Sequence, residues 1–123
     1  MKNTVLIIDD EKSLRNALSD KFTREGLEVF IAQDGKEGLE IALKNKPDII
    51  LLDIIMPVMD GIAMLKELRK DEWGKNVPVI LLTNLSDPVG DSKYVPEEGT
   101  SYMMKSDWKI KDLVKHVFDM LAK

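Results

Sequence analysis

The chain has 123 residues, of which 44% are hydrophobic and 33% charged, so it suits one domain with a buried core and is neither disordered nor membrane-embedded. The 18 Lys and Arg residues against 22 Asp and Glu give a net charge of −4, and no stretch gathers the basic residues of a nucleic-acid footprint. There is no cysteine and no secretory signal, so we expect a soluble cytoplasmic protein with no membrane partner and no direct nucleic-acid partner.

The first half of the chain predicts three units, each made of a short strand and a helix. Their strands cover residues 5–8, 28–32 and 49–53, and their helices lie at about 13–25, 36–45 and 62–71. The strands are rich in apolar residues, and the helices carry apolar residues at spacings of three and four. Gly26 and Pro47 end the first two helices, while Pro57 and Gly61 mark the loop after the third strand.

The second half begins in the same way and then departs from the pattern. A fourth apolar strand at 79–82 ends in Thr83, and a short fifth strand at 101–104 precedes an amphipathic helix at about 107–123. Between these strands, prolines and a glycine fall within residues 84–99, and an interior proline costs a helix about 3 kcal/mol. We therefore expect the fourth helix of the pattern to be short or irregular.

Apolar strands that alternate with helices indicate a parallel sheet covered on both faces. We expect an α/β fold with a doubly wound, five-stranded parallel sheet, in a single domain that covers residues 1–123. In such a sheet the C-terminal ends of all strands lie at one edge, where ligands bind. The residues that follow strand ends, and should share this edge, are Asp9, Asp10, Asp53, Thr83 and Lys105.

Asp53 ends the third apolar strand and is the candidate reactive residue. Three carboxylates gathered at one edge repel one another unless a cation neutralises them, and their hard oxygen atoms suit Mg²⁺. Thr83 and Lys105 add a hydroxyl and an ammonium donor for phosphoryl oxygens. This combination indicates phosphoryl transfer onto Asp53 as the nucleophile. Any single aspartate of this kind could equally be a helix cap or a turn residue.

Together the motifs resemble the response-regulator receiver domain of two-component signalling over essentially the whole chain. They are Val5-Leu6-Ile7-Ile8-Asp9-Asp10-Glu11, Asp53-Ile54-Ile55-Met56-Pro57, Asp60-Gly61, Leu82-Thr83 and Lys105. The resemblance implies a flavodoxin-like, CheY-like fold that takes part in phosphorelay signalling. It implies partners as well: a sensor histidine kinase or phosphotransfer protein that supplies the phosphoryl group, and an unidentified downstream protein. No output domain follows Lys123, so we expect a stand-alone regulator or one domain of a longer chain.

The resemblance also implies a metal site. Asp10 and Asp53 would bind Mg²⁺ directly, Asp9 would assist through water, and the backbone carbonyl of Ile55 would complete the protein ligands. Such a domain is a signalling module rather than an enzyme, although it assists its own aspartyl phosphorylation and dephosphorylation.

Phosphoryl binding and switching are implied in the same way. Thr83 and Lys105 would hold the phosphoryl oxygens once Asp53 is phosphorylated. Tyr102 falls on the switch aromatic of the family, which moves inward together with the threonine. Charge added at Asp53 would thereby change the shape of the output face.

Several residues depart from the usual receiver pattern. Ser106 replaces the proline that follows the lysine, so we expect either a trans Lys105-Ser106 bond with a rearranged loop or a strained cis bond. Asn84 replaces a small residue beside the switch threonine. Ile55 and Leu85 are apolar at positions that govern attack by water on the acyl phosphate, so slow self-dephosphorylation is expected.

Three other functions compete with this interpretation. A small phosphohydrolase of the haloacid-dehalogenase type needs an acid two residues after its nucleophile, and this chain has Ile55 there. A flavodoxin-like cofactor binder needs a phosphate loop after the first strand, where Asp9-Asp10-Glu11 would repel a phosphate. A purely structural interaction module without phosphorylation is kept open by Asn84 and Ser106. His116, the single histidine, is expected at the surface of the last helix.

Overall fold

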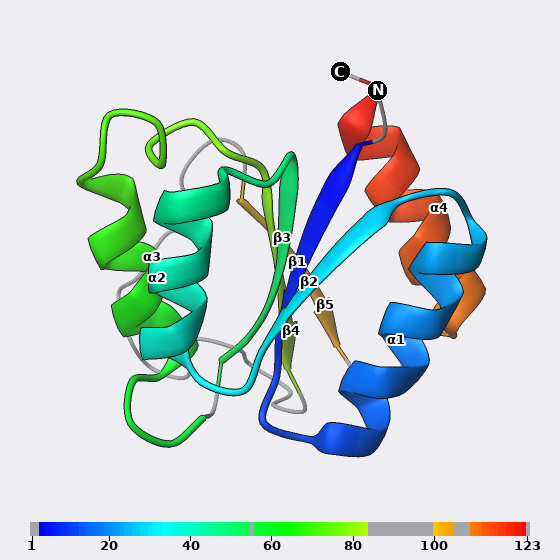
Figure 1. The fold of residues 1–123 in the computed structure, drawn as a ribbon, viewed down its shortest axis with the longest axis horizontal. Helices are drawn as coiled ribbons and strands as arrows, with labels where there is room; N and C mark the ends of the chain where they lie inside the picture. Colours follow the sequence, from blue (N-terminus) through cyan, green and yellow to red (C-terminus); the bar gives the residue numbers. More distant parts are fainter. Residues whose placement is uncertain (1–2, 55, 84–99, 105–108, 123) are drawn as a thin grey trace.

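The computed structural model describes residues 3–54, 56–83, 100–104 and 109–122 (Figure 1). Within these ranges the chain forms one five-stranded sheet in the order β2-β1-β3-β4-β5, and every neighbouring pair is parallel. The strands are β1 (Thr4–Ile8), β2 (Glu28–Ala32), β3 (Ile49–Asp53), β4 (Val79–Thr83) and β5 (Thr100–Met104). The helices are α1 (Lys12–Arg24), α2 (Gly35–Asn45), α3 (Gly61–Arg69) and α4 (Ile110–Leu121). The predicted α/β fold with a doubly wound parallel sheet is confirmed.

The sheet lies between two pairs of helices, with α2 and α3 on one face and α1 and α4 on the other (Figure 1). Side chains along a strand alternate between the two faces. In β1, Leu6 and Ile8 pack in the cluster that includes α2 and α3, whereas Val5 and Ile7 pack with α1 and α4. Because both faces are covered, the four side chains are fully buried, which explains the continuous apolar run in the sequence.

Two helices begin where an aspartate caps them. The side chain of Asp34 accepts a 2.8 Å hydrogen bond from the amide of Glu37 at the start of α2. Asp60 accepts an equivalent 2.8 Å bond from the amide of Ala63 in α3. Each cap satisfies an amide that the helix cannot, which is worth about 1 kcal/mol. Asp34 and Asp60 are therefore helix caps, the structural role that the sequence left open for each aspartate after a strand.

The expected irregular helix between β4 and β5 lies at residues 84–99, outside the described residues. The last helix, expected from about residue 107, is described from Ile110 onward. Within the described ranges, none of the helices has the length and apolar character needed to cross a membrane.

Candidate metal-binding site

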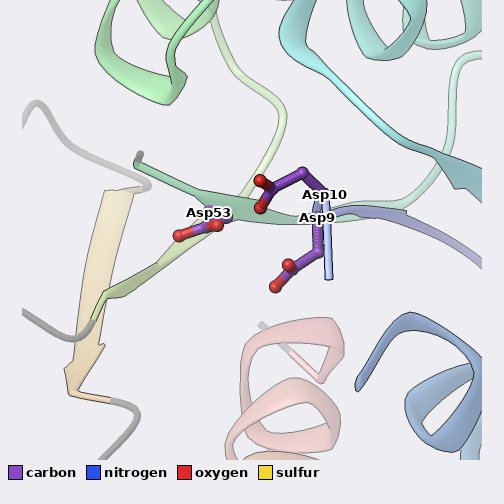
Figure 2. Close-up of side chains that lie close together, drawn as sticks. All are labelled: Asp9, Asp10 and Asp53. Carbon is purple, nitrogen blue, oxygen red and sulfur yellow. The ribbon is translucent and has the colours of Figure 1, made fainter. Parts of the chain in front are cut away.

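Three carboxylates meet at the C-terminal edge of the sheet. β1 and β3 are neighbours, and their register pairs Ile8 with Leu52, so the next residues, Asp9 and Asp53, lie at the same level along the two strands. Figure 2 shows Asp53 approaching from β3, and Asp9 and Asp10 from the turn after β1. One carboxylate oxygen from each of the three residues lies within 4.8 Å of the others. The structure thus brings together three of the residues that the sequence placed at this edge.

The three carboxylates differ in their exposure. Asp9 is 0% and Asp53 6% exposed, and they are the buried charged residues among those described, whereas Asp10 is exposed. Three carboxylates as close together as these repel one another, and a cation bound between them relieves this repulsion. The exposed Asp10 leaves this site open to solvent on one side. Hard oxygen atoms with room for water fit Mg²⁺, which keeps several waters when a protein binds it.

Hydrogen bonds fix Asp9 on three sides. Its amide donates to the carbonyl of Ala32 at 3.1 Å, and its Oδ1 accepts from the amide of Glu11 at 2.9 Å. Its carbonyl accepts from Nη1 of Arg15, in α1, at 2.8 Å. The sequence reasoning missed Arg15. The only signal for it was a basic residue in the first turns of the helix that follows the acidic motif.

The loop after Asp53 packs so closely that two glycines are required. The amide of Gly61 donates to the carbonyl of Ile54 at 2.8 Å, and a Cβ on Gly61 would collide with the carbonyl of Asp53. The amide of Gly35, at the start of α2, donates to the carbonyl of Met59 at 3.1 Å, and a Cβ there would collide with the same carbonyl. Close backbone approach, rather than a turn conformation alone, explains Gly61.

Two of the other predicted site residues, Thr83 and Tyr102, are located by their positions in strands. Thr83 ends β4, one residue beyond Leu82, which pairs with Asp53. Tyr102 lies in β5 and pairs with Leu81. The remaining residues of the sequence prediction lie outside the described part of the chain: Ile55, Asn84, Leu85, Lys105 and Ser106.

His116 is less exposed than the sequence suggested. Its Nε2 lies 2.8 Å from Oγ of Ser101, and the side chain is partly buried between α4 and β5. The expectation of a surface residue was therefore wrong in part. Ser101 is the second residue of β5, so this contact is remote from the strand ends that carry the acidic cluster.

A family model described as the response regulator receiver domain matches residues 5–118. The chain belongs to this family. Receiver domains are signalling modules of two-component systems. They generally bind Mg²⁺ at an acidic pocket, and they interact with histidine kinases or phosphotransfer proteins. In this receiver domain, Asp9, Asp10 and Asp53 form an acidic cluster.

Solved receiver structures cover nearly the whole chain. The receiver domain of the Francisella response regulator 1452 is 34% identical, with a TM-score of 0.81 and 98% of each chain covered. The chemotaxis response regulator CheY4 of Vibrio cholerae is 30% identical, with a TM-score of 0.86, covering 98% of this chain and 99% of that one.

Curated relatives are longer proteins. The response regulator PleD of Caulobacter vibrioides is 40% identical over 101 residues, which are 82% of this chain and 22% of that protein. The probable transcriptional regulator ycf27 of Guillardia theta is 43% identical over 86 residues, which are 70% of this chain and 33% of that protein. The receiver domain thus spans a third or less of these curated relatives.

Proposed function

We propose that this receiver domain accepts a phosphoryl group on Asp53 from a phosphohistidine of a sensor histidine kinase or phosphotransfer protein. The observation that carries the proposal is the cluster of Asp9, Asp10 and Asp53, whose carboxylate oxygens lie within 4.8 Å of one another at the end of the sheet. A lone buried aspartate would be a poor nucleophile for a phosphate, because two anions repel each other. A cluster that suits a divalent cation removes this obstacle.

The residues that would hold Mg²⁺ are Asp10 and Asp53 directly and Asp9 through water, with the backbone carbonyl of Ile55 as a further ligand. When bound, the ion neutralises the carboxylates and the charge of the incoming phosphoryl group. The oxygen donors present fit this ion, and the exposure of Asp10 provides its path from solvent.

In the transfer, a carboxylate oxygen of Asp53 bonds to phosphorus while the bond from phosphorus to the histidine nitrogen breaks. The electron pair of that bond stays on the imidazole, and the product is an acyl phosphate. The Thr83 hydroxyl and the Lys105 ammonium would donate hydrogen bonds to the phosphoryl oxygens. Catalysis consists mainly of positioning and charge neutralisation, so the rigid turn around Asp9 and the packed loop after Asp53 support it.

The signal would leave the site through Thr83 and Tyr102. A phosphoryl group adds negative charge and strong acceptor oxygens, so Thr83 moves toward it and Tyr102 takes the space that it leaves. The register supports this route, because β4 and β5 are neighbours and Tyr102 pairs with Leu81, two residues before Thr83. The changed surface would then bind a downstream protein.

We further infer that residues 1–123 act as one signalling domain in the cytoplasm, without enzymatic turnover of an external substrate. The net charge of −4 favours a protein partner over direct binding to nucleic acid. Family membership favours this role over a phosphohydrolase or a cofactor binder.

The proposal is tested by intact mass after incubation with acetyl phosphate, with and without Mg²⁺. We expect the mass of one phosphoryl group on the wild type in Mg²⁺ only, and none on Asp53→Ala. Asp60→Ala is the matched control, since Asp60 caps α3, and it should still be labelled. Equal labelling of Asp53→Ala would refute the assignment, and catalytic release of phosphate from a generic ester would revive the phosphohydrolase.

A further inference from the structure

Arg15 connects helix α1 to the turn that carries two of the three clustered carboxylates. Its side chain is partly buried, and Nη1 donates a 2.8 Å hydrogen bond to the carbonyl of Asp9. We propose that Arg15 is a positioning residue for Mg²⁺ binding, which acts by fixing the peptide between Asp9 and Asp10. This inference rests on the proposed function, because it concerns the same metal site.

The contact matters because of what it orients. A peptide unit is planar, so the carbonyl of Asp9 and the amide nitrogen of Asp10 turn together. Holding the carbonyl from α1 therefore holds the nitrogen and Cα of Asp10, and the bond from the Glu11 amide to Oδ1 of Asp9 restrains the backbone on the other side of Asp10. Together these bonds limit the directions in which the Asp10 side chain can leave the backbone. Asp10 needs such support, because it is exposed and no hydrogen bond of its carboxylate is found within the described residues.

Capping does not supply this support. Glu11 is the N-cap of α1, but its side chain makes no capping hydrogen bond. The turn is held instead by the bonds of Asp9: its Oδ1 accepts from the amide of Glu11, and its own amide donates to the carbonyl of Ala32 at the end of β2. Arg15 adds a bond from the side chain of α1 to the carbonyl of Asp9. Its planar guanidinium can hold a carbonyl in one orientation, which a flexible ammonium does less well.

The positioning role of Arg15 and its positive charge have opposite effects on the affinity for Mg²⁺. A cation beside three carboxylates competes with Mg²⁺, so loss of its charge alone should tighten metal binding by about twofold to fivefold, as for exposed charge pairs. Loss of an outer residue that orients a metal ligand typically weakens metal affinity by about 10 to 100-fold. The sign of the change thus separates the two roles.

The experiment compares Arg15→Met with Lys12→Met in the full chain. Lys12 is exposed in the first turn of α1, so its variant removes a nearby charge without removing a bond to Asp9. Mg²⁺ affinity is measured by calorimetry, and hydrogen exchange of the Glu11 amide is measured by NMR in the metal-free protein. We expect Arg15→Met to weaken Mg²⁺ binding about tenfold and to accelerate Glu11 exchange. Lys12→Met should leave exchange unchanged and affinity equal or slightly higher.

The inference is overturned if folded Arg15→Met binds Mg²⁺ as tightly as the wild type or more tightly, whatever the exchange rate of the Glu11 amide. If Arg15→Met does not fold, Arg15→Lys decides. The positioning role predicts severalfold weaker Mg²⁺ binding and faster Glu11 exchange in that variant, and wild-type values for both contradict it. Neither readout uses a phosphodonor, so failure to phosphorylate Asp53 would count against the proposed function alone.

Discussion

The amide of Gly35 donates a 3.1 Å hydrogen bond to the carbonyl of Met59, which joins the start of α2 to the loop after the candidate phosphoacceptor. Gly35 is buried, and a side chain there would collide with the atom that accepts this bond. The loop from Asp53 to α3 is thus anchored on a helix from another unit of the sheet. The position of this loop depends on the amide of Gly35 and the carbonyl of Met59. Every residue has a carbonyl and nearly every residue an amide, so the sequence does not reveal which two will meet.

Gly35→Ala should therefore destabilise the protein, because the Met59 carbonyl must move away from the added methyl group. We expect a loss of about 1–3 kcal/mol in the free energy of unfolding, as for overpacking in a filled interior. The measurement is urea denaturation. Lys36→Ala is the matched control, since Lys36 is exposed at the next helical position and should change stability by less than about 0.5 kcal/mol. Equal effects of the two substitutions would contradict the tight contact.

Val58→Asn should stabilise the protein. Val58 has a φ of 69°, and the amide of Met59 bonds to the carbonyl of Pro57 across it at 2.7 Å, which makes a tight γ-turn. A β-branched residue is strained in this conformation, whereas asparagine tolerates it. Val58 is 77% exposed, so little packing is lost. We expect a gain of about 1 kcal/mol in chemical denaturation.

Val58→Ala serves as the control for Val58→Asn, because alanine removes the branched side chain without the preference of asparagine for this conformation. It should gain less. A loss of stability in Val58→Asn would show that the γ-turn is not a site of strain.

Arg69→Met should be strongly destabilising. The guanidinium donates to the carbonyls of Gly74 and Val77 at 2.9 and 2.7 Å and to Oγ1 of Thr100 at 2.8 Å. It therefore joins α3 to the segment before β4 and to the first residue of β5. Removing it leaves buried acceptors without this donor, at a cost of about 2 kcal/mol or more.

The control for Arg69→Met is Lys70→Met at the next position. Lys70 forms a 3.1 Å ion pair with Glu67, but its side chain is 71% exposed, so its loss should cost less than about 1 kcal/mol. Thermal or urea unfolding of both variants gives the comparison. Similar stabilities of the two variants would contradict the structural role of Arg69.

The phosphorylated protein should lose its phosphoryl group slowly. Ile55 and Leu85 have no donor or acceptor to orient an attacking water, so we expect a lifetime of minutes or longer after the phosphodonor is removed. Leu85→Gln should shorten this lifetime severalfold by providing such a group. Intact mass over time in Mg²⁺ measures the decay, and a half-life of seconds in the wild type would contradict the expectation.

The sequence was sufficient to predict the parallel sheet and the meeting of Asp9, Asp10 and Asp53 at its edge, for one physical reason. Strands buried on both faces appear as apolar runs, and parallel strands end at one edge. The register of β1 with β3 then brings Asp9 and Asp53 to the same level, as the pattern required.

The contacts that support the site could not be predicted in this way. Arg15 reaches Asp9 because of the direction in which α1 leaves the turn. Gly35 meets Met59 because the start of α2 touches the loop before α3, which belongs to a separate unit. His116 was expected at the surface but contacts Ser101, because α4 lies against β5. Each of these depends on the distance between elements, which has no local signature in the sequence.

Phosphorylation at Asp53 is tested most directly by locating the phosphoryl group in the chain. Borohydride reduces an aspartyl phosphate to homoserine, so treatment of the phosphorylated protein followed by peptide mass spectrometry identifies the modified residue. We expect homoserine at position 53 alone, formed only when Mg²⁺ was present during phosphorylation. Homoserine at Asp9 or Asp10, or modification that does not require Mg²⁺, would contradict this expectation.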